Sequence, residues 1–456
     1  HSCNQILDNI NNIGFNWISY FKIKIMLNLI NKKILIYGFG ITGKACLNYL
    51  KKKNSVIVYD DKIKTNKNKN IKFLNKKFLN KIKLDYVVLS PGINLKNCTL
   101  KNFLLKNKKK IISELDIFYC AHKSNFKVAI TGTNGKSTTC KLLYDILKNS
   151  KKDVRLVGNI GKPVLNEKKV TKNTIFVIEV SSYQIDYSNH FKSDIAVILN
   201  IAPDHLERHN NFFNYVKVKS QLILNQNFNS KAIICKNNKV LDKYLNTRKL
   251  KSKLYKVSSN VHNNYLKQIK NEYFNNANNQ ENLNFVIKIS NLLKIKNNKL
   301  INTINNFKPL KYRQEIIFNS KKILIINDSK STSFSSTFNL LKNYKNIYWI
   351  LGGLNKKGDK IKLPKNSMQN IKGYVIGKNK SFFEKKLKNQ IQIKKITLLK
   401  NALKEVIKDI KFSTLKSNII FSPAAASFDQ FKNFEERGKY FDDLIKKFLI
   451  NTTNAK

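Results

Sequence analysis

The clearest structural signal in the chain is the segment Val128-Ala129-Ile130-Thr131-Gly132-Thr133-Asn134-Gly135-Lys136-Ser137-Thr138-Thr139. An apolar, strand-like run leads into a turn with two glycines, and a helical stretch follows the lysine. Backbone N–H groups at such a helix start can cradle phosphates, with Lys136 on the β/γ oxygens and Ser137 on Mg²⁺. The full G-x-x-x-x-G-K-[ST] loop would have glycine at Ile130. A chance turn is the alternative, but the flanking strand and helix favour a nucleotide phosphate loop.

Short apolar runs of this kind recur along the chain and are continuous, not alternating. Such runs are typical of parallel strands covered on both faces, and helical stretches such as 137–149 and 279–293 lie between them. The pattern predicts an α/β fold throughout, with ligand chemistry at the carboxyl ends of the strands. The predicted strands are Lys33–Tyr37, Val56–Tyr59, Tyr86–Leu89, Val128–Ile130, Ile175–Val180, Ile195–Leu199, Ile323–Ile326, Ile347–Leu351, Tyr374–Ile376 and Ile419–Phe421.

Length and charge set limits on the class of protein. A chain of 456 residues should hold about three domains of the usual ~100–200 residues. It carries 86 Lys+Arg against 28 Asp+Glu, formally +58, which taken alone suggests nucleic acid as a partner. The lysines run the whole length, mixed with Asn and Ile, so we interpret the charge as compositional background. It would still raise the local concentration of anionic substrates.

Cysteine usage and hydropathy favour a cytoplasmic protein. The six cysteines are isolated, with no C-x-x-C pair, as expected of reduced thiols. No apolar run reaches the ~18 residues needed to cross a bilayer, so we expect no membrane insertion. Residues 1–25 show no signal-peptide cleavage pattern, and Met26 is a candidate natural start. Residues 1–25 are therefore treated as an extension without an assigned role.

Several motifs resemble those of one enzyme family. The segment 131–137 looks like the phosphate loop of the Mur ligases and their relative folylpolyglutamate synthase. Further motifs of the central domain follow in the order that the family has. The resemblance covers about Ile34 to the end of the chain. The central motifs are Gly158–Gly161, Glu179–Gln184 and Asn200–Leu206, and those similar to the D-glutamate-adding members are Asn327–Thr332, Gly352–Lys356 and Ser422–Gly438.

The resemblance implies an ATP-dependent, ADP-forming ligase of peptidoglycan synthesis with three α/β domains. A Rossmann-like domain at 26–122 would bind the UDP substrate, a central P-loop-like domain at 123–309 would bind ATP, and a Rossmann-like carboxy-terminal domain at 310–456 would bind the amino acid. The implied reaction adds D-glutamate to UDP-N-acetylmuramoyl-L-alanine through an acyl phosphate. The alternatives are a sister ligase that adds another amino acid, or a P-loop nucleic-acid-binding protein. We expect a monomer with no specific nucleic-acid partner.

Two Mg²⁺ ions are expected beside ATP. Glu179, at a strand end, could hold one together with Ser137, and His205 suits the second. In the family a carbamylated lysine completes the second site, and Lys219 matches its position. Lys219 could equally be a solvated side chain, with Lys217 two residues away, and only the motif match selects it. The implied catalytic residues are Lys136, Glu179, His205 and Lys219, and the implied metal ligands are Ser137, Glu179, His205 and Lys219.

The first glycine cluster, Gly38–Gly43, also fits a dinucleotide-binding turn, with Asp60 following the next strand. The resemblance instead assigns this loop to the diphosphate of the UDP substrate. Ile41 and Thr42 would face the diphosphate, and Asp60 the uridine end. The implied UDP-substrate residues are Ile41, Thr42, Asp60, Ser90, Gly92, Asn159 and Ser181.

ATP and D-glutamate residues follow from the same matches. The sequence departs from the family at Asn278 and Tyr312, where histidine is usual. D-Glutamate has two carboxylates, and two lysine side chains are expected to bind them by charge. The implied ATP residues are Gly132, Thr133, Asn134, Gly135, Lys136, Ser137, Thr138, Asn279, Asn282, Arg313 and Asp328, and the implied D-glutamate residues are Lys330, Thr332, Lys356, Ser427 and Phe434.

Overall fold

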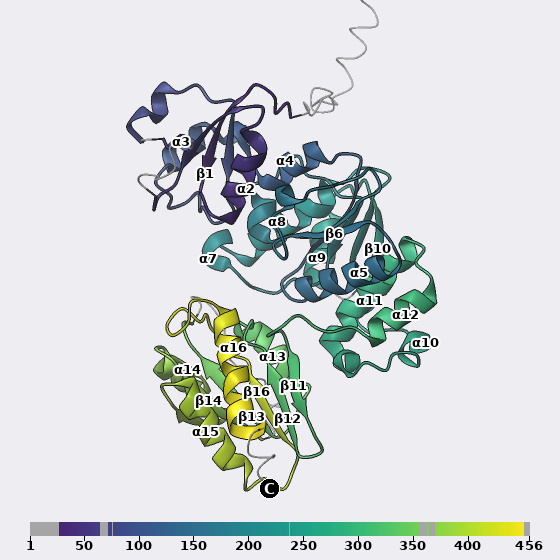
Figure 1. Ribbon diagram of the computed structural model, residues 1–456, viewed down its shortest axis with the longest axis vertical. Helices are drawn as coiled ribbons and strands as arrows, with labels where there is room; N and C mark the ends of the chain where they lie inside the picture. The colour runs from purple at the N-terminus through teal and green to yellow at the C-terminus, as the bar shows by residue number, and fades with distance from the viewer. Residues whose placement is uncertain are drawn as a thin grey trace, which may run out of the picture.

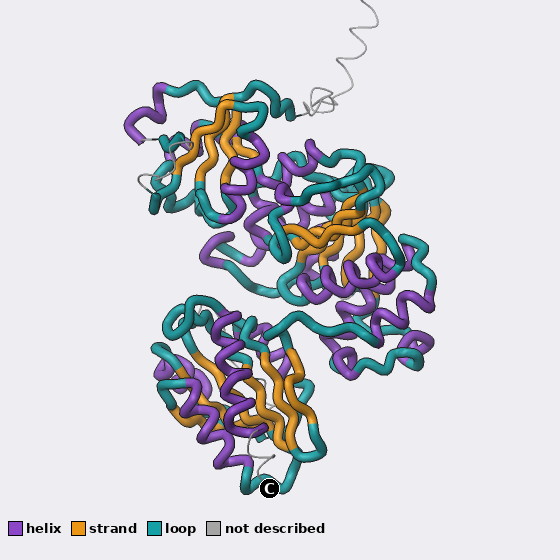
Figure 2. The backbone as a smooth tube through the Cα atoms, viewed as in Figure 1, coloured by secondary structure: helices purple, strands orange, loops and turns teal. Residues whose placement is uncertain are grey.

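The computed structural model describes residues 27–63, 72–74, 76–236, 238–355, 361, 363 and 370–450. They form three α/β units that follow one another along the chain and along the long axis of the molecule (Figure 1). Each unit has its own sheet, with helices against it (Figure 2). The predicted α/β class with mostly parallel strands is confirmed. Within the described residues, no helix combines the length and the apolarity needed to span a bilayer.

The N-terminal unit is a parallel sheet of four strands in the order β2-β1-β3-β4. The order reverses between the neighbours β1 and β3, so the loops after these two strands separate and leave a crevice, the usual ligand position in such sheets. The elements are β1 (Lys33–Tyr37), α2 (Ile41–Leu50), β2 (Ser55–Tyr59), β3 (Tyr86–Leu89), α3 (Lys101–Lys106) and β4 (Ile111–Ile112).

Helix α4 (Glu114–Ala121) joins this unit to the central one. Its first turn is fixed by a capping box in which Ser113 and Asp116 satisfy each other's backbone N–H groups. Ile117 packs in the core of the N-terminal unit, and Phe118 packs in the core of the central unit. The helix is therefore shared between two hydrophobic cores, which restricts movement at this joint.

The central unit is a parallel sheet in the order β10-β9-β8-β5-β7-β6. Strand β5 (Phe126–Thr131) lies between β7 and β8, where the chain order changes direction, and its loop leads into α5 (Lys136–Asn149). The other elements are β6 (Val154–Gly158), β7 (Ile175–Glu179), α6 (Ser182–Asp186), β8 (Ile195–Ile198), α7 (Leu206–His209), α8 (Phe212–Leu224), β9 (Lys231–Cys235), α9 (Lys239–Asn246), β10 (Lys253–Val257), α10 (Asn263–Leu266), α11 (Ala277–Leu292) and α12 (Asn297–Asn305).

The C-terminal unit has a six-stranded sheet in the order β11-β12-β16-β13-β14-β15, in which only the edge strand β11 is antiparallel to its neighbour. Trp349 is fully buried in its core and donates its indole N–H to the carbonyl of Ser422, 2.8 Å away. The elements are β11 (Glu315–Asn319), β12 (Ile323–Asn327), α13 (Phe334–Leu341), β13 (Ile347–Gly352), β14 (Ile371–Ile376), α14 (Lys380–Leu387), β15 (Gln392–Lys395), α15 (Leu399–Ile410), β16 (Ser417–Phe421) and α16 (Phe434–Ile445).

Candidate functional site

A cavity of about 1320 Å³ lies where loops of all three units meet. It receives the loops after β1, β3, β5, β7, β8 and β12, which is the carboxyl-end position expected for α/β sheets. Gly132 and Ser427 do not line it, and Lys356 lies outside the described residues. The lining residues that the sequence predicted as functional are Ile41, Thr42, Asp60, Ser90, Gly92, Thr133, Asn134, Gly135, Lys136, Ser137, Thr138, Asn159, Glu179, Ser181, His205, Lys219, Asn279, Asn282, Arg313, Asp328, Lys330, Thr332 and Phe434.

The phosphate loop between β5 and α5 is held in a tight conformation. Gly135 has a left-handed φ of +83°, and a Cβ added there would lie 2.0 Å from Oδ1 of Asn282. Lys136 donates from Nζ to the carbonyls of Gly132 and Thr133, at 2.8 and 2.9 Å. Burial lowers the pKa of Lys136, while the nearby Glu179 carboxylate opposes that shift. The loop residues, the half-buried Lys136 and the start of α5 line the cavity, an arrangement that suits phosphate binding.

Glu179 lies at the end of β7 and is 2% exposed. Its Oε1 accepts a hydrogen bond from Nδ2 of Asn159 at 2.7 Å. Within the described structure, its Oε2 is buried without a hydrogen-bond partner. Buried carboxylate oxygens are nearly always satisfied, so an orphaned one beside a phosphate loop fits a metal ligand. Ser137 lies in the first turn of the adjacent helix, directly after Lys136. Its hydroxyl supplies a second oxygen donor of the kind that Mg²⁺ prefers.

Lys219 projects from α8 and is 1% exposed. Its Nζ donates to the carbonyl of Gly132 at 2.9 Å and to Oγ1 of Thr131 at 3.1 Å. Burial, reinforced by the positive charge of Lys136, holds the pKa of Lys219 well below its usual value. Lys217 is exposed. Lys219 is therefore not a solvated side chain, and its lowered pKa favours the uncharged amine, which is the form that reacts with CO₂.

His205 immediately precedes α7 and has a left-handed backbone, with φ +53°. Its Nδ1 lies 2.9 Å from the hydroxyl of Tyr183, and its Nε2 lies 3.3 Å from Oδ2 of Asp204. These contacts fix the imidazole at the cavity wall. Among the described residues, no group of three or more His, Cys, Asp or Glu could hold a metal ion by itself. A metal here would also need hydroxyl, carbamate or substrate oxygens.

The N-terminal part of the cavity is shaped by close backbone packing. Ser90 donates from Oγ to the carbonyl of Gly38 at 2.7 Å, which ties the loop after β3 to the loop after β1. A Cβ added to Gly43 would lie 2.0 Å from that same carbonyl, so only glycine fits there. Asp60 accepts a hydrogen bond from the backbone N–H of Phe39 at 2.7 Å, so it supports the glycine loop as well as lining the cavity.

The C-terminal unit contributes a buried acid and a buried cation. Asp328 follows β12, accepts a hydrogen bond from Oγ of Ser422 at 2.8 Å, and has its pKa raised to about 7 by burial. Lys330 lies with Nζ 4.2 Å from the centre of the Phe434 ring. Burial, followed by repulsion from Arg313, lowers the pKa of Lys330 to about 8. This wall therefore attracts an anionic ligand.

Several lining residues were not predicted from the sequence. Tyr183 and Asn200 stand inside the quoted motifs but had no assigned role; Asn200 accepts a hydrogen bond at Oδ1 from the backbone N–H of Asn134, 2.8 Å away. Tyr215 lies one helical turn before Lys219 on α8, and its hydroxyl is 3.1 Å from Oγ1 of Thr133. The i, i+4 spacing to Lys219 was the signal that could have found Tyr215.

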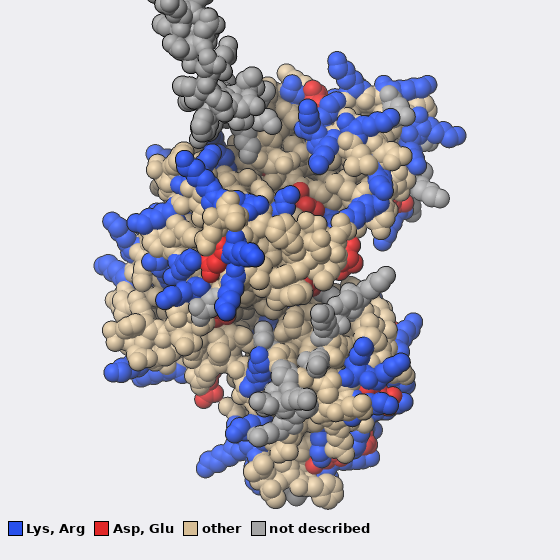
Figure 3. Space-filling view, turned by 180° about the vertical axis from the view of Figure 1, so that it is seen from behind, with Lys and Arg blue, Asp and Glu red and all other residues tan. Residues whose placement is uncertain are grey.

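The described basic residues are not gathered into one patch on the face shown in Figure 3. On the face shown in Figure 3, described Lys and Arg side chains are spread over all three units with occasional acidic neighbours. A nucleic-acid-binding protein would be expected to gather them into a patch or stripe. This distribution supports the interpretation of the charge as compositional background.

Known proteins resemble this chain along most of its length. The family model described as "Mur ligase middle domain" matches residues 130–300, and the model "Mur ligase MurD-like, N-terminal domain" matches residues 32–113. A protein of Rickettsia prowazekii named UDP-N-acetylmuramoylalanine--D-glutamate ligase is 33% identical, over 91% of this chain and 98% of its own length. A protein of the same name from Rickettsia bellii is 34% identical, over 93% and 99%. One from Fusobacterium nucleatum is 32% identical, over 92% and 100%.

Solved structures share the fold at low sequence identity. MurF ligase from Thermotoga maritima, in complex with ADP, has a TM-score of 0.55 at 14% identity and covers 92% of this chain and 97% of its own. UDP-N-acetylmuramate-alanine ligase MurC from Thermotoga maritima has a TM-score of 0.52 at 16% identity, covering 91% and 100%. These two likenesses concern the arrangement of the three units.

Proposed function

The chain belongs to the Mur ligase family, and we propose that it joins D-glutamate to UDP-N-acetylmuramoyl-L-alanine with cleavage of ATP to ADP and phosphate, in peptidoglycan synthesis. The observation that carries this function is the identity of 33–34% with D-glutamate ligases over 98–99% of their length. A sister ligase that adds another amino acid is disfavoured, because relatives from separate bacterial groups carry this same name.

The chemistry needs positioning and charge neutralisation more than covalent help from the protein. A carboxylate oxygen of the acceptor attacks the γ-phosphorus of ATP, and ADP leaves. The amine of D-glutamate then attacks the acyl carbon, loses a proton, and releases phosphate as the amide forms. Lys136 and the backbone N–H groups of the phosphate loop would hold the transferring phosphoryl group, since they already face the cavity.

We propose that Glu179 and Ser137 hold one Mg²⁺ and that His205 and Lys219 contribute to a second. Mg²⁺ would supply charge neutralisation on the phosphate oxygens. The unpartnered Oε2 of Glu179 supports the first site. For the second site, the buried Lys219 amine, whose pKa is lowered, is proposed to add CO₂, release one proton and become a carboxylate-like oxygen ligand.

The nucleotide and the amino acid would meet across the gap between the central and C-terminal units. Asn279, Asn282, Arg313 and Asp328 are proposed for ATP because they line the cavity on both sides of that gap. The departure at Tyr312 is accommodated in the C-terminal unit, where a Cβ on Gly438 would lie 2.4 Å from the Tyr312 ring. The Tyr312 ring faces α16, so Arg313 is the residue of this pair that is proposed to bind the nucleotide.

D-Glutamate is proposed to bind against Lys330, Thr332 and Phe434, where the buried ammonium attracts a carboxylate. Lys356 and Ser427 stay predictions for the same subsite. The UDP portion is proposed to lie along Ile41, Thr42, Asp60, Ser90, Gly92, Asn159 and Ser181.

The domain assignment proposed for these subsites is 26–122, 123–309 and 310–456. A monomer is proposed as the active form. The cytoplasm is the proposed compartment because the reaction consumes ATP, and the five described cysteines are free thiols.

An amino-acid panel tests the substrate. Purified enzyme with ATP, Mg²⁺ and UDP-N-acetylmuramoyl-L-alanine should release ADP with D-glutamate and not with L-glutamate, L-lysine, meso-diaminopimelate or L-alanine. Omission of the acceptor should abolish the signal. Turnover with L-lysine or meso-diaminopimelate and none with D-glutamate would overturn the assignment.

A further inference from the structure

Arg208 is a buried cation between the N-terminal and central units that the proposed mechanism does not use. It lies in α7 and is 7% exposed. No carboxylate among the described residues forms an ion pair with it within 4.0 Å, although a buried charge is costly unless it is well partnered. Its guanidinium instead lies over two aromatic rings, 4.9 Å from the centre of Tyr183 in α6 and 5.1 Å from that of Tyr187, the residue directly after α6.

Several hydrogen bonds tie this region to the loop that follows β3. The hydroxyl of Tyr187 donates to the carbonyl of Ile93 at 2.7 Å and accepts from the Arg208 guanidinium. The same guanidinium donates to the carbonyl of Pro91 at 3.4 Å. Lys96 donates from Nζ to the carbonyl of Arg208 at 2.6 Å. Residues 90–93 of this loop line the N-terminal part of the cavity, where the UDP portion is proposed to bind.

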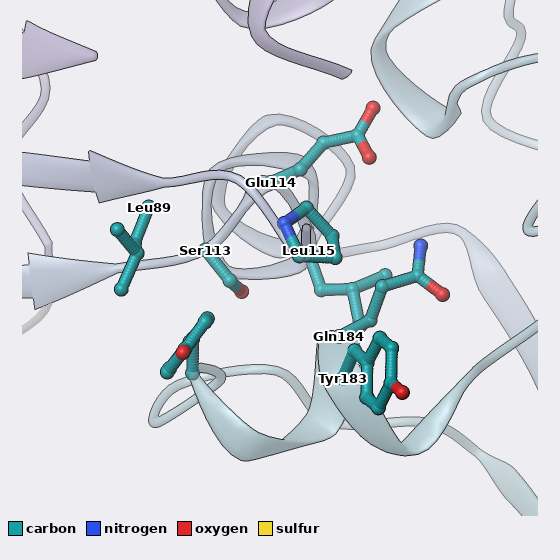
Figure 4. A pocket seen from close by; sticks show the side chains of 8 residues that line it. Leu89, Ser113, Glu114, Leu115, Tyr183 and Gln184 are labelled. Atoms are coloured by element: carbon teal, nitrogen blue, oxygen red, sulfur yellow. The ribbon is translucent and has the colours of Figure 1, made fainter. Parts of the chain in front are cut away.

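Arg208 is also linked to His205, through Tyr183. The Arg208 guanidinium lies over the Tyr183 ring. The Tyr183 hydroxyl forms a hydrogen bond with Nδ1 of His205, 2.9 Å away. His205 also precedes α7 directly, and the N–H of Arg208 donates to its carbonyl at 3.0 Å. The Arg208 side chain therefore contacts both the loop after β3 and the tyrosine that holds His205. Figure 4 shows the neighbouring part of this interface, where Tyr183 and Gln184 of α6 lie across a small pocket from Ser113, which caps α4, and Glu114, its first residue.

We propose that Arg208 is a positioning residue that couples binding of the UDP-linked acceptor to the placement of His205. The proposal rests on the proposed function, because it takes the loop at 90–93 as the acceptor's binding loop. Acceptor binding fixes the carbonyls of Pro91 and Ile93. These carbonyls hold the guanidinium and Tyr187 in place, and the guanidinium holds Tyr183 against the imidazole. His205 is thereby oriented when the acceptor is present.

Two variants separate positioning from simple structural support. Arg208→Lys keeps the positive charge but cannot reach the carbonyl and both rings together. Tyr187→Phe removes only the hydroxyl that joins Ile93 to the guanidinium, and it keeps the aromatic packing. Arg248→Met is the matched control: Arg248 also lies over a tyrosine ring, 3.8 Å from the centre of Tyr244, but it makes that contact within the central unit.

The readouts are acceptor KM and hydrogen exchange of the segment 203–211, the latter with the acceptor alone and no ATP or Mg²⁺. In the wild type, the acceptor should slow exchange in this segment. In Arg208→Lys and Tyr187→Phe that slowing should be lost, and acceptor KM should rise by roughly tenfold or more, as for loss of a charge-assisted hydrogen bond. The KM values for ATP and D-glutamate should stay within about twofold, and Arg248→Met should match the wild type.

The proposal is overturned if both variants keep wild-type acceptor KM and exchange, or if they lower only the amount of folded protein. It is also overturned if the acceptor leaves exchange of 203–211 unchanged in the wild type. If Arg208→Lys does not fold, Tyr187→Phe alone decides between these outcomes. Wild-type turnover with D-glutamate is measured first, so failure of the proposed function appears there and not in the exchange data.

Discussion

Replacing Lys219 by alanine removes a side chain that is 1% exposed and donates to both Gly132 and Thr131 next to the phosphate loop. If Lys219 carries a carbamate that serves as a metal ligand, its loss should cost at least what loss of an outer-shell partner costs, about 10- to 100-fold in activity. We expect a fall in kcat of about 100-fold, which corresponds to ~2.7 kcal/mol of barrier.

Stability should change far less than turnover. The two lost hydrogen bonds are each worth about 1 kcal/mol. Removing an amine that is costly to bury offsets part of that loss. The unfolding free energy should therefore fall by no more than ~2 kcal/mol, and the variant should remain folded. ADP release under saturating substrates gives kcat, and denaturant unfolding gives the stability on the same preparation.

Lys217→Ala is the control, because Lys217 is exposed on the same helix. It should stay within about twofold of wild-type turnover. Acetate or formate should restore part of the activity of Lys219→Ala by occupying the vacated carboxylate position, whereas ethylamine should not. Near-normal turnover of Lys219→Ala, a larger loss in Lys217→Ala, or rescue by ethylamine alone would refute the carbamate assignment.

Three further perturbations have defined outcomes. The KM for D-glutamate should rise as the pH passes about 8, where Lys330 loses its charge. In a pH series, Lys330→Arg should flatten that rise, because arginine stays protonated. An unchanged pH profile in this variant would argue against a contact between Lys330 and D-glutamate. Burial raises the pKa of Glu114 from 4.5 to about 7, so its contribution to stability is full below pH 4.5 and is lost as the pH rises towards 7. Glu114→Gln should therefore gain up to ~3 kcal/mol relative to wild type between pH 4.5 and 8 in denaturant unfolding, and a pH-independent difference would contradict the shift. Gly135→Ala places a Cβ 2.0 Å from Oδ1 of Asn282 at a residue with a left-handed φ. The KM for ATP should therefore rise about tenfold or more, while the acceptor KM stays unchanged. Equal effects on both KM values would point to general misfolding.

Much of the fold could be predicted because its strands are buried on both faces. The apolar run Lys33–Tyr37 coincides with β1, and each of the other nine runs lies in a strand to within a few residues. Five of the six described strands that were missed, β4, β6, β10, β11 and β15, lie at sheet edges, and β10 and β15 carry lysines on exposed positions. β9 is different: it is an interior strand, and its run Ala232–Cys235 could have been recognised.

The site was predictable where residue type and spacing carry the chemistry, as in the phosphate loop and at Glu179. Contacts that depend on how the units pack were not. Nothing local indicates that Arg208 contacts the carbonyl of Pro91, because these residues are distant in sequence and belong to different units. The left-handed backbone of His205 was equally unpredictable, since a positive φ is uncommon for any residue other than glycine.

The most direct test of the central claim follows the oxygen atoms. UDP-N-acetylmuramoyl-L-alanine labelled with ¹⁸O in both carboxylate oxygens is converted with ATP and D-glutamate, and the products are analysed by mass spectrometry. The proposed reaction predicts one ¹⁸O in the released phosphate, one ¹⁸O in the new amide, and a product heavier by one glutamyl residue. Phosphate without ¹⁸O, or an acceptor recovered without glutamate while ADP accumulates, would contradict it.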